Sequence, residues 1–220
     1  MSALVLLSGG LDSTVAAALR QASAGDLALG LFADYGQRAV EPERRAARAV
    51  AAALGFGLVE TTVELLARET TGALVARDAP LPAPALAQLD DPESARRAAA
   101  AVWVPNRNGV LVNLAAALAE ARGHAVVVVG FNAEEARSFP DNTPRFVAAA
   151  NAALADSTAG RVTLECPTLA LSKAELVAAG RRVGAPLHLS WSCYDSGPAA
   201  CGRCTSCLRR GRALAAAPGG

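Results

Sequence analysis

Two short stretches of the sequence contain the residue types that chemistry requires. Near the start, Ser8-Gly9-Gly10 follows a run of aliphatic residues and precedes Asp12-Ser13-Thr14 and an alanine-rich stretch. Near the end, four cysteines follow the spacing C-x7-C-x2-C-x2-C: Cys193, Cys201, Cys204 and Cys207. The first stretch predicts an anion-binding loop at a helix start, and the second predicts a metal site.

The glycine loop has the composition of a phosphate cradle but not of an ordinary P-loop. Glycines permit positive φ and close approach of the backbone, and the hydroxyls of Ser8, Ser13 and Thr14 can donate to phosphate oxygens. The loop lacks the lysine that neutralises charge around a transferring γ-phosphoryl group. Without that lysine, the loop predicts a chemistry different from that of an ordinary P-loop. For the two glycines alone, a tight turn that merely packs is the alternative.

Cations beside bound phosphates would stabilise the charge that develops in a reaction there, and the chain offers two candidates. Lys173 is the only lysine in the sequence, and Arg107 follows Pro105-Asn106. The alternative for Lys173 is an exposed residue in the first turn of a helix, which fits poorly with the positive end of the helix dipole. Asp34, at the end of a second apolar run, is a candidate for contacting ribose or adenine, or it terminates the strand in a turn.

The four cysteines predict a closed, tetrahedral Zn²⁺ site with a structural role, because no coordination position would remain open for water. An iron–sulfur cluster and a redox thiol pair are the alternatives. Cys166 lies within an apolar run and is expected to be an ordinary buried thiol. His124 and His188 show no ligand spacing.

Apolar strands and helical patterns alternate along the chain and must position these residues. The expected strands cover 3–7, the part of DLALGLFADYGQ that ends at Asp34-Tyr35-Gly36, 57–63, 125–131 and 162–169. The expected helices cover 12–23, 42–54, 107–123, 145–155 and 172–184. This alternation predicts a doubly wound, mainly parallel α/β sheet with right-handed crossovers. We expect an ATP-binding domain over 1–190 and a cysteine tail over 191–220. Residues 66–102, rich in proline and acidic residues, show no clear period and predict a long functional or disordered excursion.

Composition narrows the class of protein further. The chain has 220 residues, 52% of them hydrophobic and 4% aromatic, which suits one domain with an aliphatic core and a small appendage. A net charge of +1 gives no overall basic field, so direct nucleic-acid binding is not expected. No leader or membrane span is apparent, which predicts a cytoplasmic protein whose cysteines ligate metal and do not form disulfides.

Further strings resemble a known family. The string SGGLDST resembles the pyrophosphate loop of the ATP pyrophosphatase superfamily. This resemblance implies that the loop holds the departing pyrophosphate while attack occurs at the α-phosphate, near Lys173 and Arg107. DYGQR at 34–38, VPNRN at 104–108, GFNAEE at 130–135, LSKAEL and the cysteine tail resemble the 7-cyano-7-deazaguanine synthase family across nearly the whole chain. The resemblance implies a ligase that uses ATP to adenylate 7-carboxy-7-deazaguanine, lets ammonia form an amide, and activates that amide for dehydration to the nitrile. Such enzymes act on the route to queuosine or archaeosine.

The resemblance also implies roles for particular residues. It implies Zn²⁺ on the four cysteines, Mg²⁺ with ATP, a small deazapurine substrate, and a homodimer. Lys173, Arg107 and Asp12 are expected to be catalytic, and Asn108, Glu135 and Asp141 to bind substrate. The expected ATP-binding residues are Leu7, Ser8, Gly9, Gly10, Leu11, Asp12, Ser13, Thr14, Val15, Ala16, Ala17 and Asp34.

The sequence departs from the family pattern in two places. Asn106 stands where the family has glycine, and Asn142-Thr143 stand where it has cysteine and arginine. The second change lies in a loop expected to face the base, so adenylation of another carboxylate or amide is the alternative function. A tRNA-binding thiolase or a zinc-ribbon binding module is a third hypothesis. The near-neutral charge and the lack of a cysteine pair outside the predicted zinc set weigh against it.

Overall fold

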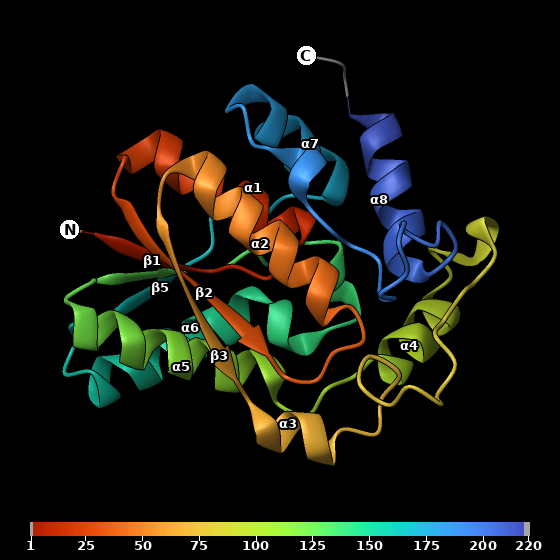
Figure 1. Ribbon diagram of the computed structural model, residues 1–220, viewed down its shortest axis with the longest axis horizontal. Coiled ribbons are helices and arrows are strands. Elements are labelled where there is room, and N and C mark those ends of the chain that lie inside the picture. Colours follow the sequence, from red (N-terminus) through yellow and green to blue (C-terminus); the bar gives the residue numbers. More distant parts are fainter. Residues whose placement is uncertain (1, 218–220) are drawn as a thin grey trace.

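The computed structural model describes residues 2–217 and is built on a five-stranded parallel sheet (Figure 1). The strand order is β3-β2-β1-β4-β5. The strands are β1 (Ala3–Leu6), β2 (Leu27–Asp34), β3 (Gly57–Thr62), β4 (Val126–Val128) and β5 (Thr163–Glu165). β1 is central, and it is apolar on both faces because helices cover both sides of the sheet.

Helices pack on opposite faces of this sheet (Figure 1). Ala3 and Val5 point toward a cluster with α1 (Leu11–Ala24) and α2 (Val40–Leu54). Leu4, between them, points toward a cluster with α5 (Arg107–Arg122) and α6 (Pro144–Ser157). Because successive side chains of a strand point to opposite faces, β1 contributes to the core on both sides of the sheet. This arrangement confirms the predicted doubly wound α/β fold.

The strand order reverses direction beside β1, and this reversal is the topological switch point of the sheet. The chain moves from β1 outward to β2 and β3, then returns to the other side of β1 with β4 and β5. The loops after β1 and after β4 therefore leave the same edge of the sheet side by side. In an open parallel sheet this is where ligands bind, and the glycine loop lies there.

The remaining helices are α7 (Lys173–Arg182) and α8 (Thr205–Ala216), with two short ones, α3 (Glu64–Glu69) and α4 (Pro92–Ala101). Short 3₁₀ turns span Leu86–Gln88, Glu135–Arg137, Pro140–Asn142 and Leu187–Leu189. α7 begins with the capping box expected for Ser172 and Glu175. Ala213 and Ala217 at the end of the tail join a buried cluster with Leu11 and Val15 of α1.

Residues 66–102 contain regular structure, so the interpretation of a disordered excursion is wrong there, and that of a functional excursion stays a prediction. α4 forms there, and α3 overlaps its start. The acidic and proline residues that argued against a helix are its start signals: Asp91 is the N-cap and accepts from the Ser94 N–H at 2.7 Å, and Pro92 occupies the first turn. Leu66, Leu74 and Val102 pack with Tyr35 near the carboxyl edge of the sheet.

Strands β4 and β5 are shorter than predicted. The ladder of β4 stops at Val128 although the apolar run continues to Phe131. A Cβ on Gly130 would lie 2.7 Å from backbone atoms of Asp12 and Ser13, so this residue passes directly against the start of α1. The end of the apolar run therefore packs against the glycine loop's helix and does not extend the sheet. Within residues 2–217, no helix combines the length and apolar character that a membrane crossing requires.

Candidate functional site

The glycine loop joins β1 to α1 and is shaped by its contact with α2. Gly9 has φ +74°, and a Cβ there would lie 2.4 Å from the Glu43 carbonyl oxygen and 2.8 Å from the Ala47 nitrogen. Both the left-handed backbone and the packing therefore require glycine. Gly10, the N-cap of α1, has an ordinary extended conformation with φ −74°.

The loop hydroxyls differ in what they face. The Thr14 hydroxyl is buried and donates to the Gly10 carbonyl at 2.7 Å, so it fixes the helix start. Ser8 is exposed, and its Oγ accepts from the Gly10 N–H at 3.2 Å and lies 3.0 Å from the Ser13 Oγ. Behind the loop, apolar side chains pack in the core: Leu7, Leu11, Val15, Ala16 and Ala17. Ser8 and the Gly10 N–H are thus the groups of this loop placed to meet an anion.

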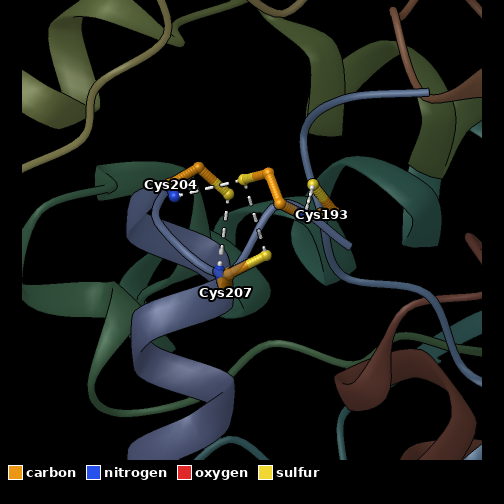
Figure 2. A group of neighbouring side chains, drawn as sticks. Cys193, Cys204 and Cys207 are labelled. Atoms are coloured by element: carbon orange, nitrogen blue, oxygen red, sulfur yellow. Dashed lines mark hydrogen bonds between the residues drawn. The ribbon is translucent and has the colours of Figure 1, made fainter. Parts of the chain in front are cut away.

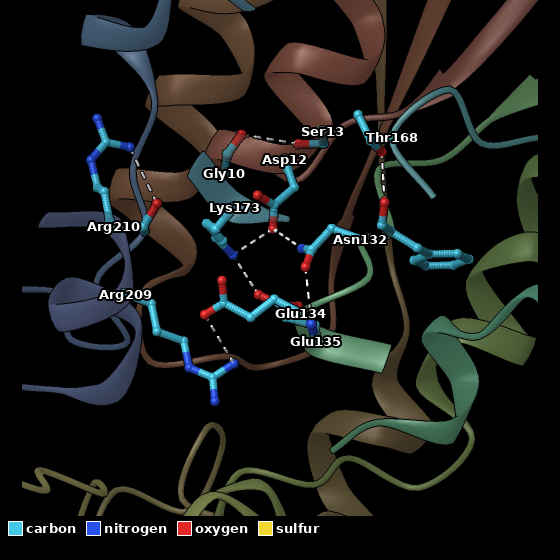
Figure 3. A network of polar contacts seen from close by, with 12 residues as sticks. Gly10, Asp12, Ser13, Asn132, Glu134, Glu135, Thr168, Lys173, Arg209 and Arg210 are labelled. Atoms are coloured by element: carbon cyan, nitrogen blue, oxygen red, sulfur yellow. Dashed lines mark hydrogen bonds and ion pairs between the residues drawn. The ribbon is translucent and has the colours of Figure 1, made fainter. Parts of the chain in front are cut away.

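A partly buried ion cluster adjoins the loop (Figure 3). The Lys173 Nζ, on the first residue of α7, lies 2.8 Å from Asp12 Oδ2 and 2.5 Å from Glu135 Oε1. Asn132 donates to Asp12 Oδ2 at 3.2 Å and accepts from the Glu135 N–H at 2.9 Å. Lys173 is only 6% exposed, so the alternative of a surface lysine is wrong. The three side chains come from α1, α7 and the loop after β4.

Burial and mutual charge set the pKa values in this cluster. Burial raises the pKa of Asp12 to about 6, with the Lys173 ammonium opposing the shift. Burial would also raise the pKa of Glu135, but Lys173 holds that pKa below its usual value. Burial alone would lower the pKa of Lys173, but the two carboxylates keep it well above its usual value. Lys173 therefore stays protonated, and Asp12 takes up a proton at a higher pH than Glu135 does.

Two adjoining cavities open beside the loop, with volumes of about 220 and 150 Å³. The larger has an apolar inner end at Leu31, Val112 and Phe131. The smaller contains Gly10 and Lys173. Both are lined by one set of polar side chains: Asp12, Glu43, Arg107, Glu135, Asn142 and Tyr194. A nucleotide beside the loop and a second small molecule would share this polar wall.

Of the predicted substrate residues, Glu135 lines both cavities, Asn108 lines the larger and Asp141 lines the smaller. The Arg107 guanidinium donates to the Tyr35 hydroxyl at 3.2 Å, and its carbon lies 5.7 Å from the centre of that ring. The Asn108 amide donates to the Asp141 carbonyl oxygen at 3.3 Å, which ties the start of α5 to the loop before α6. Asn142 is buried and lines both cavities, so one of the two residues that depart from the family pattern there faces the site.

The other departure, Asn106, has a physical explanation in its backbone. It adopts the left-handed conformation, with φ 48° and ψ 28°, at the N-cap of α5. Asparagine tolerates this region best after glycine, so it can replace glycine at modest cost. Its side-chain oxygen would lie 2.2 Å from a Cβ on Gly109, so a larger residue at 109 would require the Asn106 carboxamide to move.

Asp34 is placed differently from the other predicted ATP-binding residues. One carboxylate oxygen lies 2.7 Å from the Arg44 guanidinium and the other accepts from the Gly36 N–H at 3.0 Å. The strand does end here in a turn, as one of the two interpretations expected. Asp34 does not line either cavity described above, and its contact with ATP stays a prediction.

Several site residues were missed by reasoning from sequence, among them Glu43, Trp191 and Tyr194. Glu43 lines both cavities and accepts from the Gln37 amide at 3.0 Å, and burial raises its pKa to about 7. In the sequence, Glu43 is an acid in the first turn of a helix, and the helix dipole alone explains an acid at that position. Trp191 and Tyr194 reach the smaller cavity from the tail. Their proximity to the loop depends on the fold and leaves no local pattern.

The four tail cysteines form a cluster that could hold a metal ion (Figure 2). Their sulfurs all lie within 4.8 Å of one another, and Cys201 Sγ is 4.0 Å from Cys207 Sγ. Thiolates around one tetrahedral zinc ion are separated by about 3.8 Å. Backbone N–H groups donate to three of the sulfurs at 3.4–3.5 Å: those of Cys193, Cys201 and Cys204. The donor set and its N–H support fit a closed metal site, and Cys204 also caps α8.

The other candidate ligands lie elsewhere. Cys166 is half-buried and its Sγ lies 3.4 Å from the Phe131 carbonyl oxygen, while burial raises its pKa. The His124 Nδ1 lies 2.7 Å from the Ser2 hydroxyl. Neither residue belongs to the cysteine cluster.

Comparison with known proteins places this site in a family. The family model for "Queuosine biosynthesis protein QueC" matches residues 2–218. The chain is 49% identical to the 7-cyano-7-deazaguanine synthase of Pelotomaculum thermopropionicum, over 95% of this chain and 94% of that protein. It is 47% identical to the enzyme of the same name from Desulforudis audaxviator, over 100% of this chain and 99% of that protein.

A solved structure supports the fold alone. The U34-tRNA thiolase NcsA from Methanococcus maripaludis superposes with a TM-score of 0.54 at 11% identity, over 98% of this chain and 65% of that chain. The family assignment rests on the sequence matches, which cover the glycine loop, the ion cluster and the cysteine tail. The chain belongs to the QueC family of queuosine biosynthesis proteins.

Proposed function

We propose that the protein is a 7-cyano-7-deazaguanine synthase. The observation that supports this most strongly is the full-length similarity to enzymes of that name, at up to 49% identity. The reaction would convert 7-carboxy-7-deazaguanine, ammonia and ATP to the nitrile, with release of AMP and pyrophosphate. The carboxylate would attack the α-phosphate, ammonia would displace AMP, and a second adenylation of the amide oxygen would permit dehydration.

The glycine loop is proposed to hold the β- and γ-phosphates through the Gly10 N–H and Ser8. Lys173 and Arg107 are the proposed cations near the α-phosphate, and charge placed there before reaction stabilises the transition state. Asp12 Oδ1 is buried without a hydrogen-bond partner among residues 2–217, which suits a contact with the Mg²⁺ that accompanies ATP.

Asn108, Glu135 and Asp141 are the proposed substrate contacts. Glu135 and Asn108 line the larger cavity, and Glu135 and Asp141 line the smaller one. The cavity walls would also keep water from the reactive adenylate. We further propose that the enzyme acts in the cytoplasm and that it is a homodimer. Light scattering on the purified protein tests the oligomeric state.

A direct assay tests the proposed reaction. Purified, zinc-replete protein is incubated with ATP, Mg²⁺, ammonia and 7-carboxy-7-deazaguanine, and a parallel sample omits the carboxylate. We expect carboxylate-dependent AMP and pyrophosphate and a product with the mass of the nitrile. Sustained ATP turnover that leaves the carboxylate unchanged would contradict the proposal.

Zinc is the metal proposed for the cysteine cluster, where it would act as a structural ion. Metal analysis of the purified protein is expected to show about one zinc ion per chain. Cys201→Ser should lower that ratio, and Cys166→Ser, which changes a cysteine outside the cluster, should not. Iron with a visible charge-transfer spectrum in anaerobically purified protein would contradict zinc.

A second candidate function is adenylation of a different carboxylate or amide. It is favoured by Asn142, which departs from the family pattern and lines both cavities. A panel of carboxylates tests it through substrate-dependent AMP release. Faster AMP release with another acid than with 7-carboxy-7-deazaguanine would favour this candidate over the first.

A further inference from the structure

The tail contributes a wall of the site as well as a metal cluster. Trp191, Ser192 and Tyr194 line the smaller cavity together with Gly10, Asp12 and Lys173. The Trp191 backbone N–H donates to the Gly9 carbonyl oxygen at 2.8 Å. Residues 190–194 thus touch the glycine loop itself, from almost the opposite end of the chain.

The bond from Trp191 determines which way the loop's backbone points. In a trans peptide the C=O and the following N–H point in opposite directions. With the Gly9 carbonyl directed toward Trp191, the Gly10 N–H is directed away from the tail, where the Ser8 Oγ accepts it at 3.2 Å. If this peptide rotated, the carbonyl would face the anion in place of the N–H, which would oppose phosphate binding.

Residues 187–192 are held in turn by α8. The Arg210 guanidinium donates to the Ser190 Oγ at 2.6 Å, to the Ser192 Oγ at 3.2 Å and to the Leu187 carbonyl oxygen at 3.0 Å. Figure 3 shows Arg210 reaching from the tail helix toward this segment. The indole N–H of Trp191 donates to the Cys193 carbonyl oxygen at 2.9 Å.

Both ends of this support belong to the cysteine cluster. Cys193 follows Ser192 directly, and Cys204 and Cys207 form the N-cap and first turn of α8, one turn before Arg210. One metal ion held by all four sulfurs would join Cys193 to Cys204 and Cys207 through its bonds. A metal would therefore fix α8 relative to residues 190–194.

We propose that metal binding at the cysteine cluster and ATP binding at the glycine loop are energetically coupled through Trp191 and Arg210. This inference rests on the proposed ATP-dependent function. Arg210 is a positioning residue: it orients the segment that orients the Gly9–Gly10 peptide. Because coupling between two sites is reciprocal, ATP must raise the affinity for the metal by the factor by which the metal raises the affinity for ATP.

Calorimetry tests both directions of the coupling. Mg²⁺–ATP is titrated into zinc-loaded and zinc-depleted full-length protein, with circular dichroism recorded for each, and zinc affinity is measured by chelator competition with and without ATP. We expect zinc removal to weaken ATP binding by about tenfold or more, and ATP to strengthen zinc binding by the same factor. Equal ATP affinity with and without zinc, in protein that keeps its helical signal, would overturn the inference.

A matched pair of variants on α8 keeps the test valid if zinc-depleted protein unfolds. In zinc-loaded protein, Arg210→Gln is expected to weaken ATP binding several-fold while zinc content and the helical signal stay unchanged. Arg212→Gln removes the same charge from the same helix, but Arg212 pairs with Asp90 and Glu134, so ATP affinity should remain at the wild-type value. Wild-type ATP affinity in Arg210→Gln would overturn the inference. Absence of ATP binding by zinc-loaded wild-type protein would instead contradict the proposed function.

Discussion

The charge of Lys173 is shared between two carboxylates that come from distant parts of the sequence. The sequence identified Lys173, Asp12 and Glu135 as separate candidates for separate roles. It could not show that they meet, because α1, α7 and the loop after β4 bring them together only in the folded chain. The site therefore holds a prepositioned cation whose neutralising partners are already in place.

Lys173→Met is expected to lower the free energy of unfolding by about 3 kcal/mol near pH 8, because it leaves buried carboxylates without their cation. Their pKa values would rise, so the deficit should shrink as the pH falls toward about 5 and the carboxyls take up protons. Urea unfolding at both pH values measures this. Arg97→Met, which removes one partner of an exposed ion pair on α4, should cost below about 1 kcal/mol at either pH.

Glu43 should oppose folding at neutral pH. Its pKa is raised from 4.5 to about 7 in the folded protein, so the folded state binds the proton more tightly than the unfolded state does. Stability from this group is therefore present below pH 4.5 and is lost as the pH rises through about 7.

Glu43→Gln keeps the hydrogen bond from Gln37 and removes the buried charge. The variant should exceed the wild type in free energy of unfolding by on the order of 2 kcal/mol near pH 8, with the difference vanishing at low pH. Denaturant unfolding across this range checks it. Glu69→Gln, at an exposed position of α3, should show no such pH-dependent gain.

Among the elements, the turn between β1 and α1 contains two glycines, of which the backbone and packing require only Gly9. Gly9→Ala would place a methyl group against backbone atoms of α2 and force a left-handed backbone on alanine, so we expect a loss of about 3 kcal/mol or more. Gly10→Ala keeps an ordinary backbone, and the fold should lose below about 1 kcal/mol. Thermal unfolding of the two variants measures the contrast. Similar destabilisation by both would contradict the packing role assigned to Gly9.

Sequence reasoning located the elements best where its signals were local. Residues close together in the sequence specify the alternating strands, the Ser172 capping box and the glycine turn. α4 was missed because its N-cap acid and proline resemble a loop when they stand beside other prolines. The short length of β4 was missed because Gly130 leaves the ladder to pack against α1, which is a tertiary contact.

At the scale of the molecule, the proposed division into residues 1–190 and a tail can be tested by expressing the first part alone. Ala213 and Ala217 pack against Leu11 and Val15, and Arg181 donates to the Leu214 and Ala217 carbonyl oxygens. We expect the fragment to lose at least about 3 kcal/mol relative to the full chain and to bind a hydrophobic dye, because this apolar cluster becomes exposed. A cooperative transition at the full chain's melting temperature would show instead that the fragment folds independently.

The hydrogen bond from Trp191 to Gly9 also bears on how the protein is made. Synthesis proceeds from the amino terminus, so the glycine loop leaves the ribosome well before Trp191 does. The central strand β1 likewise cannot pair with β4 until β4 has been synthesised, more than half the chain later. Contacts between such distant segments form late and slowly. The nascent chain should therefore be unable to bind ATP tightly until the cysteine tail has emerged, so a prematurely terminated chain would not compete for the nucleotide.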